Sequence, residues 1–236
     1  MAKHIFVSGS PGSGKSVFSA ALAKASSNRD KKTIIVSGDY LIPMLPFFCG
    51  DTDTIGLGSL CKHEITPQSI ADAVKVLKAF PNIGVIGMQP NDDIMHITLT
   101  QILSIKKCLD SMVDIVIWDG TSEIGNYIDL LMRGLADLHI YILTADVKGI
   151  LYYDNYRHII TEKDNSILLE GLAKTYTAAD VLSLRTGGLY GRLYYGREIE
   201  RICMEGDIFT IDEVCHSSYR EITEKMIELV LMGKEE

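Results

Sequence analysis

The stretch Gly9-Ser-Pro-Gly-Ser-Gly-Lys-Ser16 constrains this chain more than any other feature, because it fits the spacing G-x-x-x-x-G-K-[ST]. Glycines at this spacing let successive backbone N–H groups turn around phosphate oxygens, and the helix that follows presents its positive N-terminal end. Lys15 is then placed to reach the β- and γ-phosphates of a nucleotide, and the Ser16 hydroxyl to coordinate Mg²⁺. The residues expected to contact the nucleotide here are Gly9, Ser10, Pro11, Gly12, Ser13, Gly14, Lys15, Ser16 and Val17.

A chance Gly/Ser-rich turn before Lys-Ser is the alternative. A strand pattern precedes the stretch and a helix pattern follows it, which is the context that a phosphate loop requires. The sequence therefore favours the phosphate loop.

Apolar runs alternate with helical periodicity along the chain, which is typical of βαβ units and a mostly parallel sheet. We expect strands at 4–9, 31–39, 82–87, 113–120, 137–146 and 179–188. We expect helices from Lys15, over 66–80 with Ile70, Val74 and Leu77 on one face, around 99–109, over 147–160 and over 217–231. No repeat or linker divides the sequence. The pattern predicts one α/β P-loop domain over 1–236, with a doubly wound, mostly parallel sheet and helices on both faces.

Two acidic residues close buried strand patterns and are candidates for the metal side of the site. Asp119 follows four apolar residues, at the carboxyl end of a strand where ligands bind in open sheets. The alternative for Asp119 is a helix N-cap or a turn acid. Asp39 also ends a strand pattern and is a candidate to orient an attacking water; its alternative is a turn aspartate that accepts bonds from its own backbone.

The overall composition narrows the class of protein further. The 236 residues carry a formal net charge of -8, which disfavours a broad, non-specific nucleic-acid surface but is compatible with a local basic patch. No run reaches 18 apolar residues, and the start of the chain lacks a signal-peptide pattern. The cysteines have no C-x-x-C spacing and are expected to be reduced thiols; they are Cys49, Cys61, Cys108, Cys203 and Cys215. We expect a cytoplasmic protein with no integral membrane segment.

Beyond these local patterns, the order of segments resembles that of the ParA/MinD group of P-loop ATPases, in the SIMIBI class. The resemblance covers nearly the whole chain. It is carried by the phosphate loop, "IIVSGDYLIPMLPFFCG", "NIGVIGMQP", "VDIVIWDG", "LADLHIYILTADVKGILYYDNYRHI" and the closing helices. Among subfamilies the chain is most similar to the atypical TadZ/CpaE-like members. The resemblance implies ATP and Mg²⁺ as cofactors, and a face-to-face homodimer that ATP holds together and hydrolysis releases.

Three departures from that family's pattern bear on hydrolysis. Many members have a signature lysine directly after the first glycine of the loop, where this chain has Ser10. The family pattern also has a proline two residues after the Walker B aspartate, where this chain has Thr121, and an aspartate where this chain has Ser37. Nucleotide binding is expected to be intact, since Lys15 and Ser16 remain. The hydrolysis rate is in question, because a cation supplied across an interface stabilises transition-state charge by orders of magnitude.

The segment 185–198 concentrates arginines and tyrosines among glycines. One interpretation is a segment that stacks on adenine or binds a partner, with Arg185 and Tyr194 as candidate nucleotide contacts. The other interpretation is a turn followed by an edge strand with half-exposed tyrosines.

These observations predict an ATP-binding, dimerising switch of the ParA/MinD type, with weak ATPase activity, that positions or partitions a cargo. The cargo or partner would be an unidentified protein, a DNA element or a cellular machine. Lys15 and Asp39 are the candidate catalytic residues, and Ser16 and Asp119 the candidate metal ligands. One alternative is a small-molecule kinase with an arginine-bearing lid at 187–198. The other is a degenerate, non-hydrolysing nucleotide-binding scaffold, which Ser10 favours.

Overall fold

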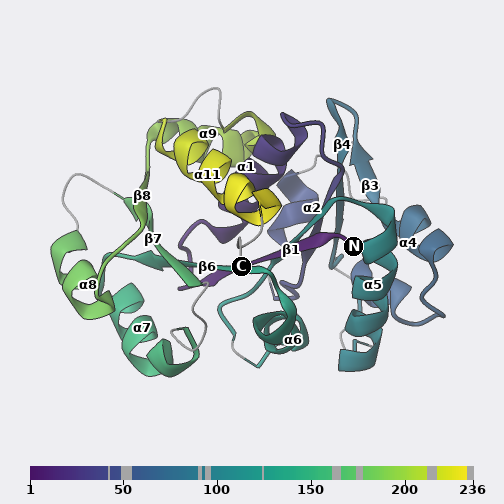
Figure 1. Cartoon of the computed structure of the whole chain (residues 1–236), viewed down its shortest axis with the longest axis horizontal. Coiled ribbons are helices and arrows are strands. Elements are labelled where there is room, and N and C mark those ends of the chain that lie inside the picture. Colours follow the sequence, from purple (N-terminus) through teal and green to yellow (C-terminus); the bar gives the residue numbers. More distant parts are fainter. Residues whose placement is uncertain are drawn as a thin grey trace.

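A computed structural model of the chain describes residues 1–41, 43–48, 55–89, 92–93, 97–123, 125–160, 166–173, 178–211 and 217–232. These residues contain an eight-stranded sheet with the strand order β3-β4-β2-β5-β1-β6-β7-β8 (Figure 1). The strands are β1 (Lys3–Gly9), β2 (Thr33–Ser37), β3 (Lys75–Leu77), β4 (Phe80–Gly87), β5 (Ile115–Asp119), β6 (Leu138–Thr144), β7 (Ser166–Ala173) and β8 (Gly191–Tyr194). Neighbouring strands are parallel except β3 and β4. The predicted mostly parallel α/β fold is confirmed.

Helices cover both faces of the sheet, as a doubly wound fold requires (Figure 1). One face carries α1 (Lys15–Ser27), α9 (Arg197–Glu205) and α11 (Ser218–Met232). The other face carries α5 (Leu99–Met112), α6 (Tyr127–Leu135), α7 (Val147–Ile160) and α8 (Ala179–Thr186). The short helices are α2 (Met44–Phe48), α3 (Leu57–Leu60), α4 (Pro67–Ala73) and η2 (Ile208–Thr210).

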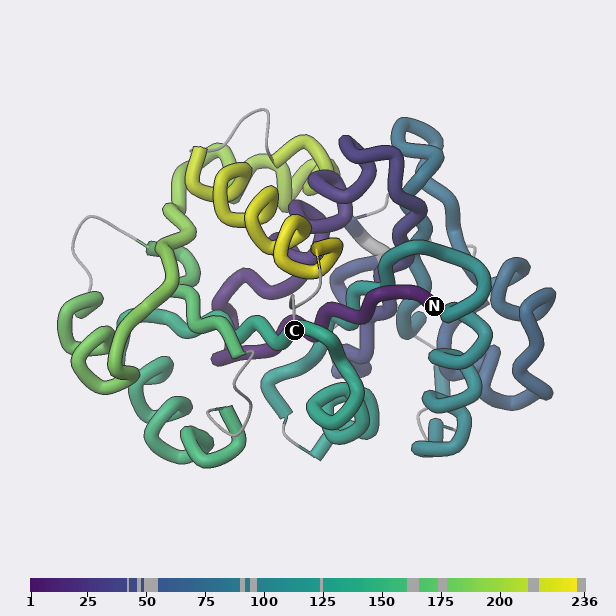
Figure 2. Tube along the Cα trace, in the orientation of Figure 1, coloured from purple at the N-terminus to yellow at the C-terminus, as the bar shows by residue number. Residues whose placement is uncertain are grey.

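The first strand runs through the middle of the fold, between segments from later in the chain (Figure 2). Its side chains alternate, so that Ile5 and Val7 join the apolar cluster under α1 while Phe6 joins the cluster on the other face. In register, Asp119 pairs with Val7 on one side and with Ser37 on the other. The carboxyl ends of β1, β2 and β5 therefore meet at one edge, and the turns that follow them can share a ligand.

The helix expected over 66–80 is wrong in its second half. It begins as predicted, with Ser69 N donating to Thr66 Oγ1 at 3.1 Å, but it ends at Ala73. Val74 is extended, and β3 then pairs antiparallel with β4, so Val74 and Leu77 do not continue a helical face from Ile70. The β-branched residues of this stretch favour a strand once a free sheet edge is available for pairing.

The strand expected at 179–188 is also wrong, because these residues form α8, which ends at Gly187 with φ of 76°. Leu182 is buried, whereas Val181 and Leu184 are exposed, so the apolar run is one helical turn and not a buried strand. The neighbouring strands are β7, which the sequence pattern did not predict, and β8. Because β8 is the edge strand, the edge-strand interpretation of 185–198 is confirmed.

Among the described helices, none is both long enough and apolar enough to cross a bilayer. Three of the five cysteines are free thiols in the structure: Cys61, Cys108 and Cys203. The other two, Cys49 and Cys215, lie outside the described residues.

Candidate nucleotide-binding site

The phosphate loop joins the end of β1 to the start of α1. Gly9 must lack a side chain, because a Cβ there would overlap the carbonyl oxygen of Ile142. Gly14 is the N-cap of α1 in the left-handed region, with φ of 90°. The Ser13 hydroxyl is buried, lines the cavity beside the loop, and has no hydrogen-bond partner in the part of the chain that the structure describes. A phosphate oxygen would supply the missing acceptor, so the loop fits the group that its sequence predicts.

Lys15 lies across the mouth of this loop. Its Nζ donates to the Ser10 carbonyl oxygen at 3.2 Å and to the Ser122 Oγ at 2.8 Å. Burial lowers the pKa of Lys15, and the negative charges of nearby carboxyl groups, Asp119 first, oppose that change. Both hydrogen-bond acceptors are uncharged, so phosphate oxygens would be stronger partners for this ammonium group than the ones it has.

Asp119 is buried at the end of β5 and accepts three hydroxyl hydrogen bonds. The hydroxyls of Ser16 and Ser37 donate to Oδ2 at 2.8 and 3.3 Å, and that of Ser19 donates to Oδ1 at 3.1 Å. Burial raises the pKa of Asp119 to about 6, against the opposing effects of the Ser16 hydrogen bond and the Lys15 charge. The N-cap of α6 is Asn126, so Asp119 is not a helix cap. The hydroxyl of Ser16 beside this carboxylate is the oxygen-donor set that Mg²⁺ prefers, and the pair fits the predicted metal site.

Asp39 lies in the turn after β2. Its Oδ1 accepts from Leu41 N at 3.1 Å, which is the turn role considered as its alternative. Asp39 also lines both hollows that reach Lys15, so the same carboxylate is available to a ligand there. The turn role is therefore observed, and the water-orienting role of Asp39 stays a prediction.

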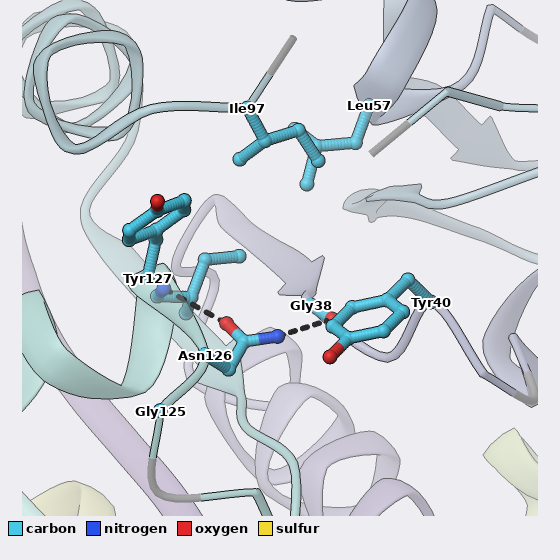
Figure 3. A pocket seen from close by; sticks show the side chains of 8 residues that line it. Gly38, Tyr40, Leu57, Ile97, Gly125, Asn126 and Tyr127 are labelled. Carbon is cyan, nitrogen blue, oxygen red and sulfur yellow. Dashed lines mark hydrogen bonds between the residues drawn. The ribbon is translucent and has the colours of Figure 1, made fainter. Parts of the chain in front are cut away.

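The turns that follow β2 and β5 are tied together (Figure 3). Asn126 Oδ1 accepts from Ile128 N at 2.9 Å, and its Nδ2 donates to the Gly38 carbonyl oxygen at 3.0 Å. The Tyr40 hydroxyl donates to the carboxylate of Glu123. A hollow of about 230 Å³ lies between the two turns; other residues that line it are Leu57, Ile97 and Tyr127. The two turns are therefore joined by direct hydrogen bonds.

A larger cavity of about 470 Å³ extends from the phosphate loop to α9. Its far side is formed by Tyr195, Ile199, Glu200 and Cys203. An aromatic ring, apolar groups and a carboxylate acceptor are the surroundings that suit a purine base. Sequence reasoning missed these residues, although one signal was available. Tyr195 lies two positions after the buried Leu193, and alternation along a strand places both on the face of α1 and α9.

The structure places the two predicted base contacts elsewhere. Arg185 Nη1 lies 3.7 Å from Asp154 Oδ2, between α8 and α7. Tyr194 is partly exposed, with the Arg192 guanidinium 5.3 Å from its ring centroid. The residue that lines the cavity beside the phosphate loop is the next one, Tyr195.

Ser10 occupies the position of the signature lysine and is fully buried. Its Oγ accepts from Thr144 N at 3.0 Å and lies 3.3 Å from Thr144 Oγ1. Thr144 Oγ1 in turn donates to Asp146 Oδ1 at 2.8 Å, and Asp146 directly precedes the first residue of α7. Residue 10 is therefore directed into the fold, toward the end of β6.

With this geometry in view, the chain can be compared with known proteins. It is 16% identical to a ParA family ATPase from Chlorobium tepidum, with a TM-score of 0.80 over 97% of this chain and 100% of that one. The septum site-determining protein MinD from Pyrococcus horikoshii, solved with Mg-ADP, is 16% identical, with a TM-score of 0.77 over 99% and 100% of the two chains. A single-substitution variant of Cyanothece McdA, in a complex with ATP, is 18% identical, with a TM-score of 0.72 over 100% and 98% of the two chains.

No protein-family model matches the sequence, and no curated protein matches it either. The structural similarity extends over nearly the full length of each compared chain and establishes the fold. The chain has the fold of the ParA/MinD ATPases, a P-loop α/β fold. The similarity to TadZ/CpaE-like members within that group stays a prediction.

Proposed function

We propose that this chain binds Mg-ATP at the carboxyl edge of its sheet and acts as a dimerising switch that positions or partitions a cargo. The observation that carries the proposal is the contact of Ser16 with Asp119 beside Lys15, at the end of a phosphate loop in a ParA/MinD fold. In this assignment the loop N–H groups and Lys15 hold the phosphates, Ser16 and Asp119 hold the metal and its water shell, and Asp39 orients the water. Mg²⁺, when bound, would neutralise charge on the phosphate oxygens.

The proposal extends to a nucleotide-dependent homodimer with an unidentified partner protein or DNA-bound cargo. Two similar proteins support it: the MinC:MinD cell division complex of Aquifex aeolicus, and a putative plasmid partition protein of Borrelia burgdorferi bound to AMPPNP. A cytoplasmic location and a weak ATPase activity stay predictions, and the cargo is unidentified.

Light scattering after size-exclusion chromatography tests this function. With Mg-ATP or a slowly hydrolysed analogue the mass should change from that of the 26.1 kDa monomer to twice that value, and with Mg-ADP it should return. Lys15→Ala should stay monomeric under every condition. A wild-type protein that stays monomeric with every nucleotide and transfers phosphate to a metabolite would overturn the proposal in favour of a kinase.

The segment considered as a kinase lid does not support that alternative. Residues 187–198 end α8, form the edge strand β8 and begin α9. Within it, Arg192 Nε donates to Glu170 Oε2 at 2.5 Å, so this arginine is paired with a neighbouring strand of the sheet.

The non-hydrolysing scaffold is the second candidate, and the buried Ser10 favours it. A side chain held by Thr144 inside its own subunit supplies no cation to a partner's phosphates. Measurement of phosphate release distinguishes the two functions. A switch should hydrolyse ATP, and its hydrolysis rate should decrease severalfold in Asp39→Ala. A scaffold should bind Mg-ATP without turnover, and Asp39→Ala should change neither quantity.

A further inference from the structure

Asp129 is a fully buried carboxylate close to the phosphate loop that the assigned roles do not use. It is the third residue of α6 and lies in the first turn of that helix. An acidic residue in a first turn usually stays at the surface and interacts with the helix dipole from there. Burial of this carboxylate against β1 and β5 therefore calls for a specific interaction.

That interaction is with the backbone turn that follows Asp119. Thr121 N donates to Asp129 Oδ1 at 3.1 Å. The Ser8 hydroxyl donates to the Thr121 carbonyl oxygen at 2.9 Å and lies 3.4 Å from Asp129 Oδ2. Both backbone polar groups of Thr121 are thus hydrogen-bonded, one to Asp129 and the other to Ser8. The ParA/MinD pattern has a proline at this position, which has no N–H to donate.

The turn is also confined sterically. Gly120 N donates to the Val7 carbonyl oxygen at 2.8 Å. A Cβ on Gly120 would lie 2.9 Å from that oxygen and 3.0 Å from Asp129 Oδ1, which is too close for either. The turn is therefore held between the end of β1 and the carboxylate of Asp129.

The opposite side of the same turn faces the phosphate site. Ser122 Oγ accepts from Lys15 Nζ at 2.8 Å, and Glu123 contacts Tyr40 beside Asp39. These residues line a hollow of about 380 Å³ at the end of the phosphate loop away from α9. A nucleotide whose base lay against α9 and whose phosphates followed the loop would place its terminal phosphate toward this turn.

Asp129 holds the turn through its acceptor oxygen, and its negative charge is less important for this role. The groups that act on its carboxyl group by hydrogen bond or by charge are Thr121 N, the guanidinium of Arg133, the ammonium of Lys15 and the Ser8 hydroxyl. Burial raises the pKa of Asp129 to about 7, and the Thr121 hydrogen bond and the two cations oppose that rise. An asparagine would present the same acceptor oxygen without a buried charge.

We propose that Asp129 is the positioning residue for the turn that meets the terminal phosphate, and that it favours a triphosphate over a diphosphate through Ser122 and Lys15. It does so without touching the nucleotide. The inference rests on the proposed nucleotide-binding function.

Equilibrium affinities of the full chain for Mg-ATPγS and Mg-ADP test the inference. Asp129→Ala should lower the preference for ATPγS about tenfold, the usual worth of one or two hydrogen bonds. Asp129→Ser, which is too short to reach Thr121 N, should do the same if the alanine variant is unstable. Asp129→Asn should stay within about threefold of wild type, because it keeps the acceptor. Asp137→Asn is the control, since Asp137 lies just beyond the other end of α6 and its replacement should leave the preference for ATPγS unchanged.

A double-mutant cycle identifies the route of the effect. In a Ser122→Ala background the Asp129→Ala change should have no further effect on the ATPγS preference, because both act through one turn. Additive effects, or an unchanged preference in folded Asp129→Ala and Asp129→Ser, would overturn the inference. A wild-type protein that binds neither nucleotide would instead overturn the proposed function, so the two failures are distinguishable.

Discussion

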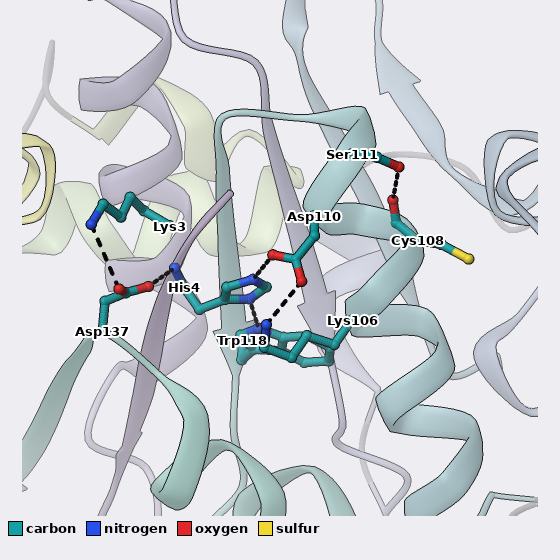
Figure 4. Close-up of polar contacts among 8 residues, drawn as sticks. All are labelled: Lys3, His4, Lys106, Cys108, Asp110, Ser111, Trp118 and Asp137. Atoms are coloured by element: carbon teal, nitrogen blue, oxygen red, sulfur yellow. Dashed lines mark hydrogen bonds and ion pairs between the residues drawn. The ribbon is translucent and has the colours of Figure 1, made fainter. Parts of the chain in front are cut away.

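The two ends of the central strands treat buried polar groups in opposite ways. At the amino end, His4 Nε2 lies 2.9 Å from Asp110 Oδ1, while Trp118 Nε1 donates to His4 Nδ1 at 2.9 Å (Figure 4). Lys106 Nζ completes the group, 3.0 Å from Asp110 Oδ2. Charged and ring groups there satisfy one another within the protein. At the carboxyl end, Lys15 donates to uncharged oxygens, and the carboxyl group of Asp119 is surrounded by hydroxyls.

The difference assigns each end its role. A polar cluster whose members satisfy one another contributes to stability and has little to offer a ligand. A buried cation and carboxyl group with uncharged partners gain from an added phosphate and metal ion, because these ligands are charged. The amino end is therefore expected to determine stability, and the carboxyl end to determine binding.

Removal of one lysine from each end of the central strands should distinguish binding from stability. Lys15→Ala should lower the affinity for Mg-ATPγS about 100-fold, because charge-assisted contacts to phosphate are lost. Its melting temperature should stay near that of wild type. Lys106→Ala should leave the affinity unchanged and lower the free energy of unfolding by about 1 kcal/mol. Calorimetric titration and thermal denaturation measure the two quantities, and a reversed pattern would contradict the assignment.

The second prediction is that the protein gains stability when a buried charge is removed from the carboxyl end of the central strands. Because the pKa of Asp119 is raised from 3.8 to about 6, its contribution to stability is present below pH 3.8 and is lost as the pH rises through about 6. Asp119→Asn removes that loss and should raise the free energy of unfolding at pH 8 by on the order of 2 kcal/mol. The same variant should bind Mg-nucleotide more weakly. Urea denaturation without ligand measures the gain, and a less stable variant at pH 8 would count against a costly buried charge.

The amino end should respond to pH with the opposite sign. Burial lowers the pKa of His4 below 6.5, and the positive charge of Lys106 acts in the same direction. The hydrogen bond that His4 donates to Asp110 and the negative charges of Asp110 and Asp137 oppose this decrease. The folded state then binds fewer protons than the unfolded state. The contribution of His4 is present above pH 6.5 and is lost as the pH falls through the folded pKa. Between pH 7 and 5, wild type should lose stability relative to His4→Gln, measured by urea denaturation at each pH.

The smallest effect uses thiols as local probes. Cys203 lines the cavity beside α9, so saturating Mg-ATPγS should slow its alkylation severalfold. Cys108 on α5 should react at the same rate with and without nucleotide. Cys61 is buried, and burial raises the pKa of its thiol to about 11, so it should stay unreactive. Peptide mass spectrometry resolves the sites, and equal protection of Cys108 would show a global effect instead of occupancy of this cavity.

The sequence predicted the parts of this site that lie within one contiguous stretch. The loop from Gly9 to Ser16 follows from glycine spacing, and Asp119 follows from its place after an apolar strand. The sequence pointed to Tyr194, whereas the residue that lines the cavity is Tyr195. The side of β8 that faces the phosphate loop depends on tertiary packing. Asp129 was not predicted at all, since nothing in the sequence distinguishes a buried first-turn acid from an exposed one. The error at 179–188 has the same origin, because Val181 and Leu184 are apolar yet exposed.

Calorimetric titration of the purified protein with Mg-ATP is the decisive test of nucleotide binding at the carboxyl end of the sheet. Saturable binding of one nucleotide per chain is expected, and it should require Mg²⁺. Lys15→Ala should weaken this binding about 100-fold, and Lys106→Ala should leave it unchanged. A folded wild-type protein that binds no nucleotide, or a Lys15→Ala variant that binds as tightly as wild type, would contradict this expectation.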